Sequence, residues 1–352
     1  MKKTQMTHRE RIMAAIDHKP TDRVPMDYWG VGEITEKLMK YFGVNDYLGL
    51  SKALDIDSII TIDPPMIKEG RSGVWDVERK QVVLQDGSVY SEPVRRPIEA
   101  YETINEIDAN YEWPTTDMFD YSGIKQLCEK YRSEGYAVMG GFISLTLHYE
   151  GIRGTEQMLL DFAGDSELAE YVLYKINKFA SAHAKKILDA GEGLIDIAQV
   201  TDDLGDQKGL RMSPEMIERY LGHYYVSNTA MIKGYGARVF HHDDGAIAGL
   251  IPWIAEKGCQ ILNPLQWHLP GWDLKKIKKE YGAKLCFHGG IDNQDILPFK
   301  GPEEVKAEVK ACIDALYCDR TGYILAPCHN IQGLTPVENV IAMYDFAKKY
   351  SM

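Results

Sequence analysis

Short apolar runs alternate with longer amphipathic stretches along most of this chain. Short runs of β-branched, aromatic and aliphatic residues are typical of buried strands, whereas apolar residues at every third or fourth position are typical of helices. The runs span residues 24–29, 58–62, 137–142, 194–200, 237–240, 260–262, 284–287 and 322–326. Strands that alternate with helices in this way predict an α/β fold, a (β/α)8 TIM barrel, with residues 1–352 as a single domain.

Capping signals place several helices between these strands. Thr7, followed three residues later by Glu10, forms a capping box that predicts a helical extension before the first strand. Ser213-Pro214 and Thr335-Pro336 each place proline at the start of a predicted helix. Residues 74–90 depart from the barrel pattern, because they alternate around Asp86-Gly87 and so predict an inserted hairpin.

Polar residues gather where the predicted strands end. The run 237–240 leads directly into His241-His242-Asp243-Asp244, and burying four such groups is costly unless they are paired or bind a cation. The other polar or aromatic ends are Asp27-Tyr28-Trp29, Asp63, Asp202-Asp203, Asn263, His288 and Cys328-His329. Because the carboxyl ends of barrel strands meet at one mouth, where catalytic groups lie, we expect a single active site there.

Charge and composition exclude several classes of function. The formal net charge of -12 argues against nucleic acid and anionic membranes as partners, because both favour clustered Lys and Arg. No apolar run is long enough for a membrane span, and the charged stretch 7–18 argues against a signal peptide. The six cysteines show no CxxC spacing, so we expect reduced thiols and a cytoplasmic protein.

Alternation along an extended segment divides the histidine–aspartate cluster into two pairs. His242 and Asp244 fall on the same side, which suits two ligands of one metal ion or one substrate-binding pair. The alternative is a hydrogen bond between Asp244 and His242 that only holds a loop in place. His241 points the other way, where we expect it to pack or to support the site with Asp243 as its partner. His241 and Asn263 are also candidates for substrate contact.

The remaining strand ends offer groups for proton transfer and for substrate binding. Asp63, Asp203 and His288 are candidate catalytic residues, although Asp203 could instead cap a helix and His288 could be a core histidine. Tyr28 and Trp29 would form an aromatic wall for a flat substrate, with core filling as the alternative.

Cys328 and His329 are adjacent at the last predicted strand end. Neighbouring residues on a strand rarely face the same ion, so we expect one of them to be a ligand. Cys328 has the softer chemistry, but a buried cysteine is also common as a small hydrophobic residue.

Six segments spread over nearly the whole chain form a recognisable pattern. They are Arg9-Glu10-Arg11-Ile12-Met13-Ala14-Ala15-Ile16, Asp22-Arg23-Val24-Pro25, Gly140-Gly141-Phe142, Asp202-Asp203-Leu204-Gly205, Gly289-Gly290-Ile291-Asp292, and the closing Asn330-Ile331-Gln332 with Thr335-Pro336-Val337-Glu338-Asn339. With these segments the chain resembles the uroporphyrinogen decarboxylase superfamily, and within it the corrinoid-dependent methyltransferase branch.

One departure argues against porphyrinogen decarboxylation. The decarboxylases carry an arginine-rich signature after the first strand, which holds the carboxylates of their substrate. Here that place reads Tyr28-Trp29-Gly30-Val31-Gly32-Glu33, without arginine. Asp63 does fall near the decarboxylases' essential aspartate, but a single matching residue does not restore the activity.

The resemblance to the methyltransferases implies a metal site with altered ligands. In that branch zinc is held by a His-x-Cys-Gly motif and by a cysteine after the last strand. The motif corresponds to His242-Asp243-Asp244-Gly245, with Asp244 in place of the cysteine, and the last cysteine falls on His329, one residue after Cys328. Zinc or another divalent metal is therefore expected on His242, Asp244 and either His329 or Cys328.

The resemblance implies a methyltransferase that works with a corrinoid-binding partner protein. It would move a methyl group between a small substrate, such as a methoxylated aromatic compound, and the cobalt of the partner's corrinoid. The alternative is a cofactor-independent decarboxylase or lyase that uses Asp63, Asp203 and His288. A binding or sensor protein on a barrel scaffold is a third hypothesis. Family members often form homodimers, so a dimer is expected.

Overall fold

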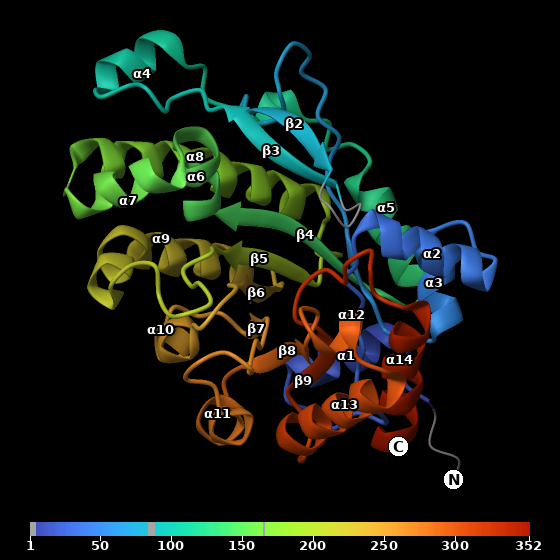
Figure 1. Ribbon diagram of the computed structural model, residues 1–352. Coiled ribbons are helices and arrows are strands. Elements are labelled where there is room, and N and C mark those ends of the chain that lie inside the picture. The colour runs from blue at the N-terminus through green and yellow to red at the C-terminus, as the bar shows by residue number, and fades with distance from the viewer. Residues whose placement is uncertain (1–4, 84–88, 165) are drawn as a thin grey trace.

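A curled, seven-stranded parallel sheet forms the centre of the protein, with helices packed around its outside (Figure 1). The computed structural model describes residues 5–83, 89–164 and 166–352. The strands follow the order β1 (Ile59–Thr61), β4 (Ala137–Ser144), β5 (Ile197–Thr201), β6 (Arg238–His242), β7 (Ile261–Asn263), β8 (Cys286–Ile291) and β9 (Tyr323–Pro327). These are seven of the eight predicted strands.

The predicted first strand, residues 24–29, is not among the seven strands of the described sheet, so the expected TIM barrel is supported as a curled parallel sheet with a seven-stranded ladder. The contact of residues 24–29 with β9 amounts to one bridge, between Met26 and Leu325. On the side of β1, the amide of Ile59 donates to the Asp27 carboxylate at 2.9 Å. The Met26 carbonyl oxygen also accepts the backbone amides of Asp57 at 2.8 Å and of Ser58 at 3.2 Å. Side-chain and backbone oxygens together therefore tie this segment to the start of β1, although no regular ladder forms there within the described residues.

Helices cover the sheet from outside. They are α1 (His8–Ile16), α2 (Gly32–Phe42), α3 (Tyr47–Leu54), α4 (Ile104–Asn110), α5 (Ile124–Ser133), α6 (Thr146–Arg153), α7 (Thr155–Ala163), α8 (Glu167–Ala190), α9 (Pro214–Gly234), α10 (Ile251–Glu256), α11 (Leu274–Tyr281), α12 (Ile296–Phe299), α13 (Pro302–Leu316) and α14 (Val337–Ser351). The capping box of Thr7 and Glu10 is confirmed at α1, and Ser213 caps α9. At α14, Pro336 is itself the N-cap residue, so the helix begins at Val337, one residue later than predicted.

The predicted insertion is an antiparallel pair, β2 (Glu78–Val83) and β3 (Val89–Arg95). It extends five residues beyond the predicted end at residue 90. The expected turn at Asp86-Gly87 lies outside the described residues.

The structure shows the state of the cysteines and the apolar length of the helices. All six cysteines are free, and only Cys318 is exposed. Among the helices that the structure describes, none is both long and apolar enough to cross a membrane.

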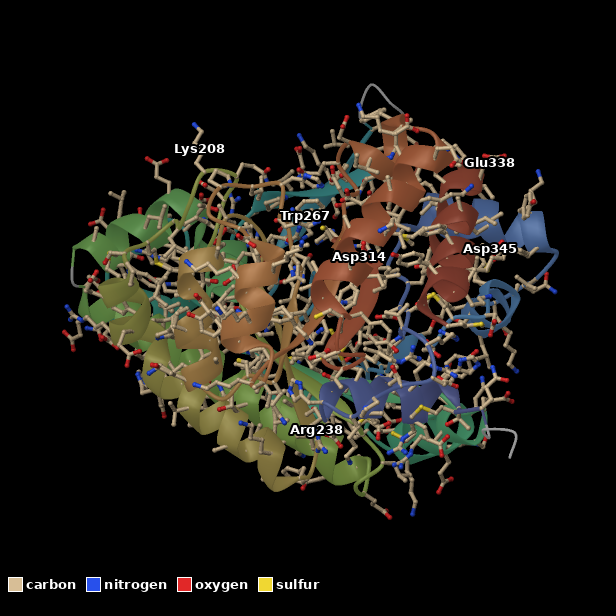
Figure 2. All side chains as sticks on the ribbon, turned by 90° about the horizontal axis from the view of Figure 1, so that it is seen from below. Lys208, Arg238, Trp267, Asp314, Glu338 and Asp345 are labelled. Carbon is tan, nitrogen blue, oxygen red and sulfur yellow. The ribbon has the colours of Figure 1, made fainter. Side chains whose placement is uncertain are left out.

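Helix α1 closes the amino-terminal end of the curled sheet. Ile16 belongs to an apolar cluster that includes Phe240 and Ile324 from the strands. At the same end, Arg238 at the start of β6 lies 2.8 Å from Asp17, which caps α1 (Figure 2, seen from below). Because this end is filled by side chains, the polar strand ends at the opposite edge are free to form a site.

A buried charge network joins α1, residues 24–29 and the start of β1. Asp57 is fully buried and accepts hydrogen bonds from Arg11, Arg23 (2.8 Å), the Met26 amide (2.9 Å) and His8 (3.0 Å). Burial by itself would raise the pKa of Asp57. The hydrogen bond from His8 and the charges of both arginines outweigh it and lower the pKa. The network therefore substitutes for the missing strand ladder.

Replacement of Asp57 by asparagine should destabilise the protein strongly. The change leaves Arg11 and Arg23 buried without their counter-charge, which costs about 3–5 kcal/mol in comparable buried pairs. Denaturant unfolding of D57N measures the loss. The control E192Q removes the exposed pair between Lys125 and Glu192, and should cost far less, because exposed ion pairs contribute little to stability. Equal losses in the two variants would contradict a structural role for the network.

Candidate metal site and the cavities around it

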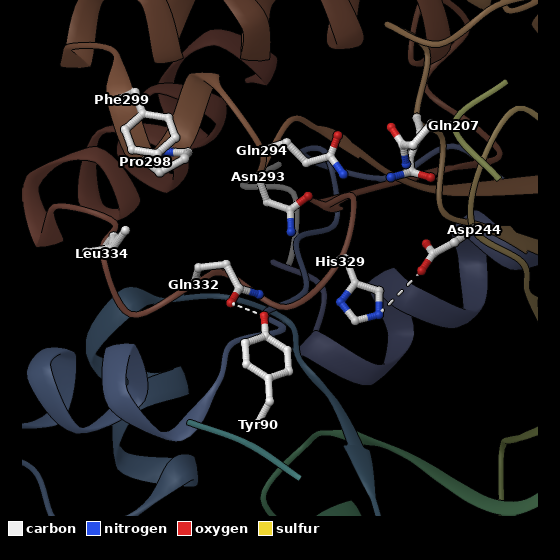
Figure 3. Close-up of a pocket in the computed structure, with 11 residues that line it drawn as sticks. Tyr90, Gln207, Asp244, Asn293, Gln294, Pro298, Phe299, His329, Gln332 and Leu334 are labelled. Atoms are coloured by element: carbon white, nitrogen blue, oxygen red, sulfur yellow. Dashed lines mark hydrogen bonds and ion pairs between the residues drawn. The ribbon is translucent and has the colours of Figure 1, made fainter. Parts of the chain in front are cut away.

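The ends of β6 and β9 bring together three side chains that can bind a metal ion. The carboxylate Oδ2 of Asp244 lies 3.7 Å from Nε2 of His242 and 3.5 Å from Nε2 of His329. One ligand atom from each residue falls within 4.8 Å of the other two. Figure 3 shows His329 and Asp244 facing each other across one side of a cavity. These are three of the residues predicted as ligands from the sequence.

A row of hydrogen bonds behind His242 orients its ring. His242 donates from Nδ1 to Oδ1 of Asn263 at 2.6 Å, and Asn263 donates from Nδ2 to Nδ1 of His288 at 2.8 Å. His288 then donates from Nε2 to Asp27 at 2.9 Å. Since Nδ1 of His242 donates to Asn263, Nε2 is the ring atom that points toward Asp244. Metal-binding histidines are commonly oriented in this way.

The donor set suits a catalytic divalent metal. Two imidazoles and one carboxylate are common zinc ligands, and three protein ligands leave a position for substrate. Oδ1 of Asp244 is buried and has no hydrogen-bond partner, so it remains available as a ligand atom. With no cysteine, the set is harder than that of the methyltransferase branch and also suits other divalent metals.

Electrostatics favours an ionised pair at this site. Burial lowers the pKa of His242, but the hydrogen bond and charge of Asp244 outweigh it and raise that pKa overall. Burial likewise raises the pKa of Asp244, but the hydrogen bond and the charge of His242 outweigh burial and lower that pKa overall. Metal binding would replace this proton-mediated attraction and release the proton from His242.

Cys328 lies apart from the three ligand candidates. Its thiol is buried and donates to the Leu265 carbonyl oxygen at 3.2 Å. Burial raises the pKa of the thiol well above its ordinary value, which disfavours a thiolate. Of the two alternatives at the end of β9, the geometry places His329 with the cluster.

His241 and Asp243 face the opposite side, in the packing against α9. His241 is fully buried, with Nδ1 3.0 Å from the Val200 carbonyl oxygen and its ring against Tyr225. Oδ1 of Asp243 accepts the Leu204 amide at 2.8 Å. The predicted substrate contact of His241 is therefore corrected, because its ring is shielded from the cavities. Both residues hold the loop that carries Asp203.

Three further candidates are also buried away from the cavities. His288 and Asn263 are fully buried and use their side chains to orient His242, so we correct catalysis and substrate contact to positioning. Tyr28 donates to or accepts from Thr35 at 2.8 Å and is only 2% exposed. Of the two residues predicted as an aromatic wall, Trp29 lines the central cavity, stacked on His242 with ring centroids 5.6 Å apart.

A central cavity of about 330 Å³ contains the metal candidates and Asp203. Burial raises the pKa of Asp203 to about 6, and although His242 lowers it, the charges of Asp243, Asp244 and Asp202 raise it further. Asp203 does not cap the following helix, since Ser213 accepts the Met216 amide. It thus has the environment of a carboxylic acid that is partly protonated near neutral pH.

Two glycines allow the Asp203 loop to approach the metal candidates. A side chain on Gly205 would place its Cβ only 2.5 Å from the Asp244 carbonyl oxygen. Gly245 has φ of +100°, and its Cβ would lie 2.6 Å from the Asp206 carbonyl oxygen. The two loops can pack this closely only without side chains there.

A larger cavity of about 540 Å³ adjoins Asp244 and His329 (Figure 3). Five carboxamide side chains line it: Gln207, Gln266, Asn293, Gln294 and Gln332. Oδ1 of Asn293 is buried without a hydrogen-bond partner, and Phe299 and Leu334 are exposed at the rim. The sequence analysis missed these residues, because scattered amides leave no periodic signal.

Asp63 lies in a third cavity, beside the central one, and the two share Phe142. The structure therefore does not place Asp63 next to Asp203 in one cavity. Aromatic residues from four separate segments surround Asp63, and the sequence analysis did not identify them.

Comparison with known proteins places the chain in a family. The model of the uroporphyrinogen decarboxylase (URO-D) family matches residues 82–350. The chain belongs to the URO-D family. A curated uroporphyrinogen decarboxylase from Dechloromonas aromatica (strain RCB) is 30% identical over 98 residues, which are 28% of this chain and 26% of that protein. The match thus spans about a quarter of that relative.

A solved methyltransferase from Methanosarcina mazei shares the fold of this URO-D family member. The alignment covers 98% of this chain and 99% of that chain, with a TM-score of 0.69 and 16% sequence identity. The fold is therefore shared over almost the whole length of both proteins, and the resemblance seen in the sequence is confirmed at the level of family and fold.

Removal of any one ligand candidate should abolish tight metal binding. H242A, D244A and H329A each leave two ligands, so we expect metal retained after dialysis to fall by at least about tenfold. Metal analysis of protein loaded with Zn²⁺, Co²⁺ or Mn²⁺ measures this. C328S is the matched control and should keep its metal. Loss of metal from C328S, with retention in H329A, would assign the ligand to the thiol instead.

Proposed function

We propose that this protein is a methyltransferase that moves a methyl group between a small substrate and the cobalt of a corrinoid carried by a partner protein. The observation that carries the proposal is the group His242, Asp244 and His329, which opens into a cavity with Asp203 and Trp29 on its walls. Family membership and the shared fold support this function.

The protein groups have separate tasks in this proposal. His242, Asp244 and His329 would hold the divalent metal, which acts as a Lewis acid on an oxygen or sulfur atom of the substrate when bound. Asp203 would donate a proton to the leaving oxygen, which is a poor leaving group as an anion. Trp29 provides a flat apolar wall, and Asn263 accepts from Nδ1 of His242, which leaves Nε2 as the atom that would bind the metal.

The amide-lined cavity beside His329 is our candidate for the corrinoid docking face. A corrinoid supplies a cobalt centre that can take up or release a methyl group, and its edge carries both amides and methyl groups. Amides such as Asn293 and Gln294 can donate to and accept from such an edge. The exposed Phe299 and Leu334 suit contact with the partner protein.

The lining of the three cavities supports a substrate other than a polycarboxylated tetrapyrrole. Within the described residues, neither lysine nor arginine lines any of them. A methoxylated compound of modest size fits the central cavity and needs the assistance that Asp203 and a metal would give. The alternative decarboxylase or lyase would require Asp63, Asp203 and His288 to act together, and this is less well supported because His288 is buried behind the site.

Methylcobalamin formation tests the proposal directly. Metal-loaded protein, cob(I)alamin and a panel of methoxylated aromatic and aliphatic compounds should give the absorbance spectrum of methylcobalamin with at least one substrate. We expect H242A and D244A to lower the rate at least about 100-fold, and C328S to leave it nearly unchanged. Absence of metal, together with no substrate-dependent methylation across the panel, would refute the function.

The pH dependence of the demethylation rate should reflect the protonation of Asp203. Since burial raises its pKa to about 6, demethylation should slow as the pH rises through about 6 and the proton is lost. D203N should lower the rate by about 100-fold at pH 6 and remove this limb of the profile. Steady-state rates between pH 5 and 8 measure both effects.

A stability measurement separates this role from a structural one. The folded state binds the Asp203 proton more tightly than the unfolded state, so this group contributes stability below pH 4 that is lost between about pH 4 and 6. D203N should therefore be as stable as the wild type or more stable at pH 7. A large loss of stability at pH 7 would point to a structural role.

A further inference from the structure

The cavity that contains Asp63 is a cage of aromatic rings. It measures about 320 Å³, and its rings are Trp75, Phe119, Phe142, His148, Phe179 and His183. Its wall residue Phe142 is shared with the central cavity, so a ligand in the cage lies one side chain away from the proposed methyl-transfer site.

Contacts between the rings make the wall continuous. Trp75 meets Phe179 edge to face, with centroids 5.3 Å apart, and its centroid lies 4.8 Å from that of His148. Phe179 stacks on His183 at 5.4 Å. Helix α8 supplies both Phe179 and His183, four residues apart on one face, whereas Trp75 comes from the segment before the inserted hairpin. The segment before the hairpin thus adds one wall of the cavity to those from β4, α6 and α8.

The charged side chain in the lining of the cage is a carboxylate. Among the residues that the structure describes, Asp63, which follows β1, is the only carboxyl group in the lining, and no lysine or arginine lines it. Burial lowers the pKa of His148 and of His183 to about 4, so both imidazoles are neutral at physiological pH. Burial among apolar groups also raises the pKa of Asp63, and a neighbouring cation would favour its ionised form.

These features select among ligands of similar size. Aromatic faces attract organic cations, and clusters of such rings are the usual way of recognising methylated ammonium groups. A carboxylated aromatic ligand would instead bring a second anion beside Asp63 with no counter-charge in the lining. An uncharged ligand would gain the apolar contacts but nothing from the carboxylate.

We propose that this cage binds a methylated ammonium group, so that the substrate is a small organic cation whose other end reaches the central cavity past Phe142. The assignment of this cation as a substrate rests on the proposed function, whereas its binding does not. Asp63 then acts in recognition, through its charge, and not in proton transfer as the sequence suggested.

Binding of choline to the full-length protein tests the proposal without corrinoid or added metal. Its uncharged isostere, 3,3-dimethylbutan-1-ol, has the same shape. By calorimetry or tryptophan fluorescence, the wild type should bind choline at least about tenfold more tightly than the isostere. D63N should lose this preference and bind the isostere unchanged. Equal affinity of the wild type for the two probes, or choline binding unaffected in D63N, would overturn the proposal.

A control with the same change in net charge isolates the local effect. D345N removes an exposed carboxylate on α14 and should bind choline like the wild type. W75L should weaken choline binding while leaving metal content unchanged, and a melting curve confirms that each variant is folded. Choline binding in a protein that never methylates cobalamin would refute the proposed function alone. Methylation of cobalamin without a preference for choline over its isostere would refute the cage alone.

Discussion

The site depends on a row of hydrogen-bonded side chains that crosses the buried interior from Asp27 through His288 and Asn263 to His242. Each member is held by its neighbour, and Asp27 also receives the amide of Ile59 at the start of β1. The row therefore joins the segment that replaces the eighth strand to the imidazole that faces the central cavity. Breaking it would affect both the closure of the sheet and the tautomer of His242, because the same carboxylate serves both.

The carboxylates around this row differ in protonation because their surroundings differ. Asp57, met by two arginines and a histidine, stays ionised and ties the amino-terminal segments together. Asp244 stays ionised beside His242, whereas the pKa of Asp203 is raised to about 6 because burial and neighbouring negative charges disfavour its ionised form. Among the described residues, no lysine or arginine lines the three cavities, so their walls offer no positive side chain to neutralise an anionic ligand.

Hydrophobic periodicity predicted seven strands of the sheet and the main covering helices, because those segments are apolar enough to be buried whatever their neighbours are. Residues 24–29 form no ladder in the described sheet: Met26 makes isolated backbone contacts, and the carboxylates of Asp27 and Asp57 accept further backbone amides. Alternation separated His242 and Asp244 from His241 and Asp243, since side chains on a strand point to opposite sides. Burial of His288 and Asn263 could not be predicted, because a polar residue at a strand end reads the same whether it faces a cavity or a neighbouring side chain.

The sequence by itself determined the family, the parallel sheet and the two ligand candidates His242 and Asp244. These follow from local patterns and from motifs within a few residues of one strand end. Only the tertiary structure placed His329 and not Cys328 with the other ligand candidates, and only it placed Asp63 in a different cavity from Asp203. The physical reason is that both questions concern contacts between distant segments: the thiol is satisfied by Leu265, while α8 and the segment before the hairpin enclose the carboxylate in aromatic rings. Such contacts have no periodicity along the chain, so they appear only when the chain is folded.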